Sequence, residues 1–122
     1  MNLARLYTWI IGGLFLIAVG TTLAIELAAQ GVTLEAGHKA IHVAIGVWAV
    51  FIVTNNWSSQ YRLFAFSNGI LWGCVAIVGW LLPDFQGLDA FNRLDTILHT
   101  GVAVTGLLSG LFPVVPLKKL GL

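Results

Sequence analysis

Four long apolar stretches, separated by short polar segments, dominate the pattern of this chain. The stretches without Asp, Glu, Lys or Arg cover residues 6–25, 40–61, 63–82 and 96–117. Each is close to the ~20 residues that a helix needs to cross ~30 Å of hydrocarbon. An open strand in lipid would leave its backbone polar groups unpaired, so each stretch is predicted to be helical. The predicted spans are residues 5–27, 37–54, 62–82 and 91–112, with 54–60 as a polar connection.

The amino-acid composition also indicates that most of the protein surface faces lipid. Of the 122 residues, 58% are hydrophobic and 9% are charged, whereas a soluble domain has about 25% charged residues. We therefore predict an all-α integral membrane four-helix bundle that forms one transmembrane domain over residues 1–122, with the lipid bilayer as its main partner. The first apolar stretch is longer than the core of a signal peptide, so we expect it to be retained.

Charged residues divide between the two ends of such a bundle. The end that holds both termini and the middle connection has only basic residues, which are Arg5, Arg62, Lys118 and Lys119. The opposite end has all the acids, which are Glu26, Glu35, Asp84, Asp89 and Asp95. Basic residues stay cytoplasmic during insertion. The pattern predicts a multi-pass membrane protein with both termini in the cytoplasm. Glu26 can either pair with Lys39 or face water, and we expect it to face water.

An internal repeat relates the two halves of the chain. An offset of 62 − 5 = 57 residues aligns Arg5-Leu6-Tyr7 with Arg62-Leu63-Phe64 and Ile41-His42 with Leu98-His99. The same offset places Phe15 on Trp72 and His38 on Asp95. We predict two repeated helical hairpins, residues 1–57 and 58–122, related by a pseudo-twofold axis along the membrane normal.

One polar cluster is predicted near the acidic end of the second and fourth spans. His38 and His42 are four residues apart and share a helix face, as do Asp95 and His99. The repeat places His42 and His99 at one depth in the membrane. If the second and fourth helices meet, these four side chains converge.

Three interpretations of this cluster remain open. A His–His or His–Asp hydrogen bond across the two hairpins would satisfy polar groups that are costly in a membrane. Alternatively, His42 and His99 are cofactor-binding ligands for a haem or a chlorophyll-type pigment. Alternatively, a metal ion is held by His38, His42, Asp95 and His99, whose ligand types suit zinc, copper or iron.

Other chemistry has little support in the chain. No nucleophile with an activating base and no phosphate-binding loop is recognisable, so we expect no enzymatic activity. A formal net charge of +1 gives no indication of a nucleic-acid partner. Cys74 is the single cysteine, which rules out an intramolecular disulfide and a c-type haem attachment motif.

A family resemblance supports the predicted layout. The segment Leu94-Asp95-Thr96-Ile97-Leu98-His99, followed by an apolar, glycine-rich run, resembles the start of the fourth helix in uncharacterised four-helix bacterial membrane proteins with a DoxX-like layout. The first copy is Gly37-His38-Lys39-Ala40-Ile41-His42, in which His38 replaces the expected Asp or Asn. The resemblance covers residues 3–111 and implies two hairpins with a histidine near the start of the second and fourth helices. It implies a multi-pass protein of the bacterial inner (plasma) membrane, but no particular chemistry.

Together these patterns predict a small non-enzymatic membrane protein. The connections are too short to form a soluble domain, so we expect an accessory or scaffold subunit of a larger membrane complex. The alternatives are a haem- or chlorophyll-binding subunit of an electron-transfer or photosynthetic assembly that uses His42 and His99, and a metal-binding membrane protein.

Overall fold

The computed structural model describes residues 1–114, 116, 118 and 121. Four of its helices are long and apolar enough to cross a membrane: Leu3–Gln30, Leu34–Thr54, Ser58–Leu81 and Arg93–Leu111. In each, only 17–39% of the residues in the most apolar 18-residue window are buried inside the bundle. An exposed apolar surface of this extent suits lipid as the solvent. The all-helical, four-helix prediction is confirmed.

The first spanning helix has three sections. They are α1 (Leu3–Gly13), the π-helical segment η1 (Leu14–Val19) and α2 (Gly20–Gln30). The other three spans are α3 (Leu34–Thr54), α4 (Ser58–Leu81) and α5 (Arg93–Leu111). The connection before α5 contains two 3₁₀ turns, η2 (Phe85–Gly87) and η3 (Asp89–Phe91).

Capping residues explain where the helix boundaries differ from the predicted ones. The Thr33 side chain accepts a hydrogen bond from the Ala36 backbone N–H, so α3 begins three residues before the predicted start. The Asn92 side chain accepts one from Asp95 N–H, so α5 begins two residues later than predicted. The connection expected at 54–60 shortens to residues 55–57, where Asn56 has φ +51°.

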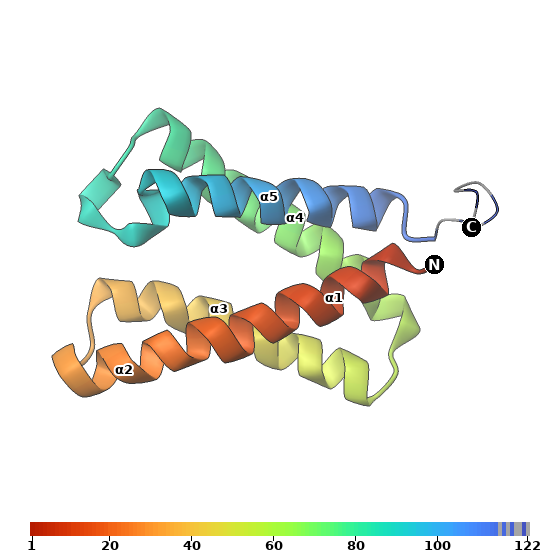
Figure 1. The fold of residues 1–122 in the computed structure, drawn as a ribbon, viewed down its shortest axis with the longest axis horizontal. Coiled ribbons are helices and arrows are strands. Elements are labelled where there is room, and N and C mark those ends of the chain that lie inside the picture. Colours follow the sequence, from red (N-terminus) through yellow and green to blue (C-terminus); the bar gives the residue numbers. More distant parts are fainter. Residues whose placement is uncertain (115, 117, 119–120, 122) are drawn as a thin grey trace.

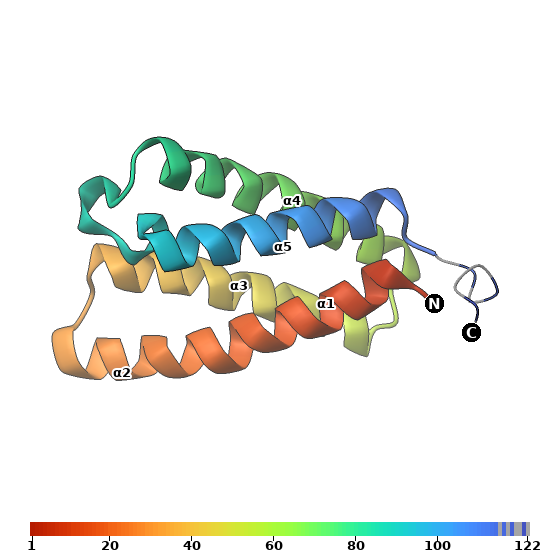
Figure 2. The same cartoon turned by 45° about the horizontal axis from the view of Figure 1, so that its top comes forward.

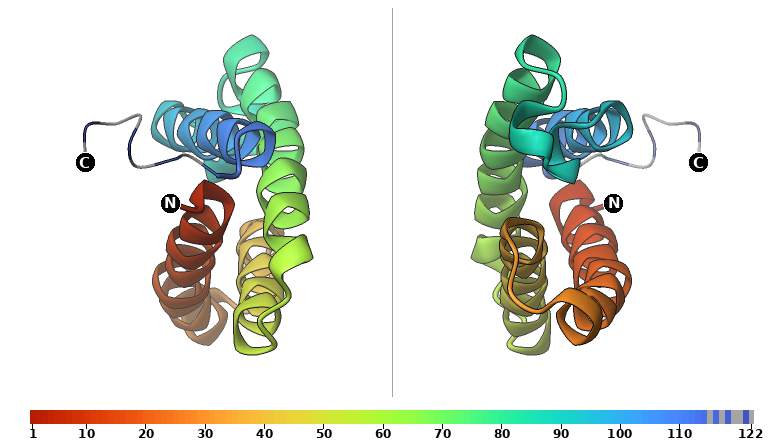
Figure 3. Two further views of the ribbon diagram at one scale, coloured as in Figure 1. Left: turned by 90° about the vertical axis from the view of Figure 1, so that its right-hand side faces the viewer. Right: turned by 90° about the vertical axis from the view of Figure 1, so that its left-hand side faces the viewer.

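Consecutive spans form two antiparallel hairpins. The first helix packs against α3, α4 packs against α5, and α1 also contacts α4 and α5. Figure 1 shows the N-terminus and the last turn of α5 at one end of the bundle, and Figure 2 shows the α2–α3 and α4–α5 connections together at the other. The two end views in Figure 3 show α4 crossing the bundle beside α3 and α5.

Glycines allow the closest approach, between α4 and α5. A Cβ atom at Gly106 would lie 2.7 Å from the Ala65 carbonyl oxygen and 2.7 Å from the Tyr7 hydroxyl oxygen. A Cβ at Gly69 would lie 2.7 Å from the Leu107 backbone nitrogen. Small residues are the usual means by which membrane helices pack tightly, because lipid gives no hydrophobic force between them.

Two hydrogen bonds join the N-terminal helix α1 to the C-terminal part of the chain. The Leu3 N–H donates to the Pro113 carbonyl at 2.7 Å, and Tyr7 donates to the Val102 carbonyl at 2.9 Å. Both bonds tie α1 to the second hairpin. Lys119 lies outside the described residues, so the basic cluster predicted at that end is described only in part. The internal repeat and the cytoplasmic orientation of the termini stay predictions.

Candidate functional site

Three imidazoles meet at the end of the bundle that holds the α2–α3 and α4–α5 connections. His38 and His42 come from α3, and His99 comes from α5. One ring nitrogen from each lies within 4.8 Å of those of the other two. His42 and His99 are only 6% and 4% exposed. The predicted meeting of the histidines from the second and fourth spans is therefore present.

Trp72 forms a platform under two of these rings. Its indole is stacked on His42 with ring centres 4.2 Å apart and on His99 with ring centres 4.9 Å apart. The two imidazole centres are 5.6 Å apart and nearly parallel. An indole between two parallel rings would hold their centres about 7 Å apart, since each stacked pair needs about 3.5 Å. His42 and His99 therefore lie side by side on one face of the indole.

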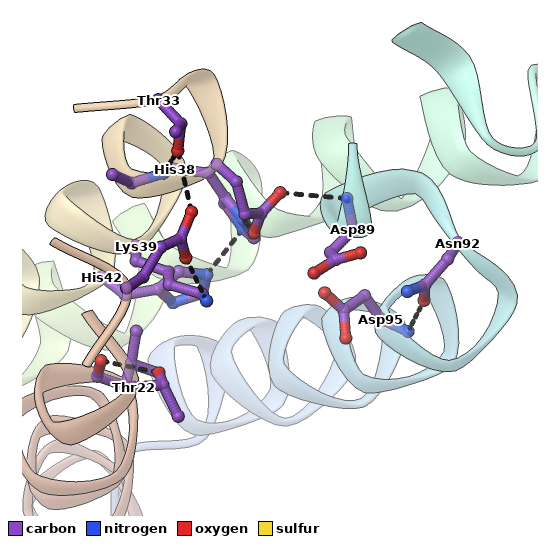
Figure 4. A network of polar contacts seen from close by, with 12 residues as sticks. Thr22, Thr33, His38, Lys39, His42, Asp89, Asn92 and Asp95 are labelled. Atoms are coloured by element: carbon purple, nitrogen blue, oxygen red, sulfur yellow. Dashed lines mark hydrogen bonds and ion pairs between the residues drawn. The ribbon is translucent and has the colours of Figure 1, made fainter. Parts of the chain in front are cut away.

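A hydrogen-bonded chain orients His38. Its Nδ1 lies 2.9 Å from Oε1 of Glu35, and the Asp89 backbone N–H donates to Oε2 of Glu35 at 3.0 Å. Because the Glu35 carboxylate accepts from Nδ1–H, a neutral His38 has a free electron pair on Nε2. His42 Nε2, at 3.0 Å, then donates to it. Figure 4 shows this chain, with His38 between the connection before α5 and His42.

Two nitrogens of the cluster are buried without a hydrogen-bond partner of normal geometry. They are Nδ1 of His42 and Nδ1 of His99. The Ala90 backbone makes only a weaker polar contact with His99. Among the described residues, no hydrogen bond joins His42 or His99 across the two hairpins, contrary to the structural interpretation of the cluster. Buried polar atoms without partners are rare in folded proteins, and each points to a bound water, an ion, a catalytic role or strain.

Asp95 lies apart from this group. Its carboxylate is not among the ligand atoms that cluster with the three imidazoles. It lines the same cavity, and in Figure 4 the side chains of Asp89 and Asp95 point toward one another across a space from His42 and Lys39. Of the four predicted ligands, the structure thus brings together His38, His42 and His99.

A cavity of about 450 Å³ opens beside the cluster. Its lining is mostly apolar and comes from the first helix, α3, η3 and α5, and includes all three histidines. A second, polar cavity of about 500 Å³ adjoins it at the end of the bundle. The two share the lining residues Thr22, Glu35, Lys39 and Asp89. The histidines can therefore be reached from the aqueous end.

The mouth of this path is acidic. Lys39 Nζ lies 2.5 Å from Oε2 of Glu26, and Thr33 donates to Oε1 of Glu26 at 2.7 Å. Of the two alternatives for Glu26, the structure shows the pair with Lys39 of the neighbouring helix and not the expected simple exposure to water. With Lys39 paired in this way, the remaining carboxylates at the mouth favour the approach of cations.

Two members of the site were missed in the sequence, although a signal existed for both. Glu35 is three residues before His38, a spacing that places two side chains on one helix face. Trp72 aligns with Phe15 in the repeat, and both aromatic rings contact His42, with Phe15 edge-on at 4.3 Å. The aligned aromatic pair thus indicated the surroundings of the histidines.

Comparison with known proteins gave no match: no family model fits the chain, and no curated protein or solved structure is significantly similar to it. The resemblance to proteins with a DoxX-like layout therefore stays a prediction. Any functional assignment depends on the geometry of the histidine cluster.

Proposed function

We propose that this multi-pass membrane protein binds one transition-metal ion through His38, His42 and His99. The observation that supports this most directly is the convergence of three ligand nitrogens from two helices, within 4.8 Å of one another, at a place with two unpartnered buried nitrogens. A three-histidine set leaves a fourth position for water or another ligand, as in catalytic zinc sites.

Ring positions fit a shared ion. Metal–nitrogen bonds of about 2.0–2.1 Å, plus about 1.1 Å to the ring centre, put two imidazole centres about 5.2 Å apart on a tetrahedral ion. The three distances between ring centres are 4.8, 5.6 and 5.7 Å. Binding replaces the proton shared by His38 and His42, so a small rotation of the rings completes the site.

The surroundings of the rings also suit a metal. Metal-ligating histidines commonly donate their second ring N–H to a carboxylate, which fixes the ring and raises its basicity. Glu35 holds His38 in this manner through Nδ1, which leaves Nε2 for the ion. Imidazole ligands suit zinc, copper, nickel and iron.

The same packing disfavours a macrocycle between His42 and His99. Axial ligation requires the two imidazoles to face the iron from opposite sides of the ring, whereas these imidazoles lie side by side on Trp72. His38 also occupies the space next to both, 4.8 and 5.7 Å away between ring centres. A haem ligated by both histidines would therefore have to displace Trp72 and His38.

The decisive experiment is metal titration of the purified full-length protein. We expect the chelator-treated protein to bind one Zn²⁺ per chain and, with Co²⁺, to develop the visible absorption of a tetrahedral site. At a free-ion concentration of 100 times Kd, binding should stabilise the fold by about 2.7 kcal/mol. Substoichiometric binding and an unchanged melting temperature would refute the proposal, and a tightly bound coloured macrocycle would support the alternative.

Glu35 offers a separate test of the orienting carboxylate. Glu35→Gln removes the charge that fixes His38 and should weaken Zn²⁺ binding by about 10–100-fold, the usual effect of losing an outer-sphere partner. The matched control is Glu26→Gln, which changes a carboxylate that pairs with Lys39 and not with a histidine. Equal affinities of the Glu35→Gln and wild-type proteins, measured by competition with a chelator, would contradict this role.

An accessory role in a larger complex and the absence of enzymatic activity stay predictions. A metal site at one end of the bundle is compatible with either a binding subunit or a carrier. The titration distinguishes metal binding from a purely structural cluster in both cases.

A further inference from the structure

The cavity beside the histidines has the shape and lining of a lipid site. We propose that it binds one neutral single-chain amphiphile with an oxygen-bearing head group, such as a monoacylglycerol, from the membrane leaflet at the histidine end of the bundle. This inference goes beyond metal binding and does not depend on it.

The first helix and α5 diverge to form this cavity. They meet at the level of Tyr7, which donates to the Val102 carbonyl at 2.9 Å. Beyond that level neither η1 nor α2 packs against α5, and Figure 1 shows the two helices separating toward the histidine end. Val102, whose carbonyl accepts this bond, also lines the cleft, which has a volume of about 450 Å³, within the range of small-molecule sites.

The apolar walls of the cleft face lipid. Leu14 on the first helix and Leu98 on α5 line opposite walls and are 53% and 55% exposed. Ala18, one turn after Leu14 on the first helix, is also exposed. Both walls belong to membrane-spanning helices, so the medium outside the cleft is hydrocarbon. A lipid chain can enter from the side without passing through water.

The depth of the cleft matches one leaflet. Its lining on the first helix runs from Leu14 to Thr22, a rise of about 12 Å at 1.5 Å per residue. Half of the ~30 Å hydrocarbon core is about 15 Å. The cleft therefore has room for one chain of one leaflet, with its head group near the end of the bundle.

The polar end of the cleft selects the head group. It contains His38, His42 and His99, of which two have a buried nitrogen without a hydrogen-bond partner. Glu35, Asp89 and Asp95 line the same end, and the single lysine there is paired with Glu26. An anionic head group would meet this excess of carboxylates, whereas hydroxyl and ester oxygens can bond imidazole without that repulsion.

Photo-crosslinking in vesicles tests this site. The full-length protein, in phosphatidylcholine vesicles, is labelled with a monoacylglycerol that has a diazirine in its acyl chain. We expect adducts on the cleft walls, at Leu14, Ala18, Leu98 or Val102, and competition by unlabelled monoacylglycerol. Labels distributed evenly over the lipid-exposed faces, or insensitive to competition, would overturn the proposal.

A matched pair of variants and a second probe sharpen the test. Ala18→Phe fills the cleft and should lower labelling of its walls by at least about tenfold. Ala24→Phe, the same change at an exposed position outside the lining, should leave labelling unchanged. An alkyl sulfate with the same diazirine chain should label the walls at least about fivefold less. Unchanged labelling of Ala18→Phe overturns the site, and equal labelling by the sulfate overturns the neutral head group.

Metal binding is measured on the same samples, so that a failure of the lipid proposal can be distinguished from a failure of the metal proposal. Ala18→Phe should still bind one Zn²⁺, because Ala18 is not a ligand. Loss of lipid labelling with retained metal binding supports two independent properties of the site. Wild-type labelling without metal binding would refute the metal proposal alone.

Discussion

Replacing His99 with alanine is expected to reduce Zn²⁺ affinity by more than about a thousandfold, beyond the 10–100-fold effect of an outer-sphere residue. Of the three proposed ligands, only His99 comes from the second hairpin, and without it His38 and His42 would remain as two ligands on one helix. Chelator competition measures the affinity. Thr105→Ala, on the same helix but exposed and outside the cluster, is the control and should bind as the wild type does.

The same variant separates a metal role from a structural one. Without metal, His99→Ala loses a stacking partner of Trp72, and its free energy of unfolding should fall by about 0.5–1.5 kcal/mol. With Zn²⁺ at 100 times Kd, the wild type should gain about 2.7 kcal/mol and the variant nothing. A difference in stability between the two proteins that is the same with and without metal would show that His99 is only structural.

A large effect on folding is expected from Gly106→Ala. The added Cβ would lie 2.7 Å from the Ala65 carbonyl oxygen and from the Tyr7 hydroxyl oxygen, both held by helix packing. Relieving such contacts requires α4 and α5 to move apart, at a cost of about 1–3 kcal/mol. The measurement is the unfolding free energy in detergent micelles, followed by circular dichroism.

Gly101 is the matched control, because it lies on the same helix with no atom near enough to contact a new Cβ. Gly101→Ala should be neutral or more stable by about 0.5–1 kcal/mol, since alanine favours the helix. Equal stabilities of the two alanine variants would mean that close approach at Gly106 does not hold the second hairpin together.

The spans were predictable because lipid imposes a strong and simple requirement on sequence. Uncharged stretches of about 20 residues leave few alternatives to helices. The exact ends of the helices were harder to predict, because Thr33 and Asn92 act as caps only when a helix begins beside them. Nothing in hydropathy distinguishes such a residue from any other polar residue in a connection.

The site was predictable to the level of the histidines. Helical spacing and the repeat indicated that His42 and His99 share a depth, but only the crossing of the helices decides which side chains meet. The predicted repeat makes Asp95 equivalent to His38, yet the Asp95 carboxylate lies outside the group of three imidazoles. Glu35 belongs to the site because its side chain turns toward His38, and Trp72 because α4 crosses next to the histidines. Neither the side-chain rotamer nor the helix crossing can be read from the sequence pattern.

The π-helical segment Leu14–Val19 determines which way the side chains of α2 point around the axis of the first helix. A π-bulge holds one residue more than an α-helical turn, so it rotates the rest of the helix by about 100° relative to an uninterrupted α-helix. Glu26 faces Lys39 across the mouth of the histidine site in this rotated frame. Without the wider turn, the side chains of α2 would be rotated by about 100°, and Thr22 and Glu26 would no longer point at the site.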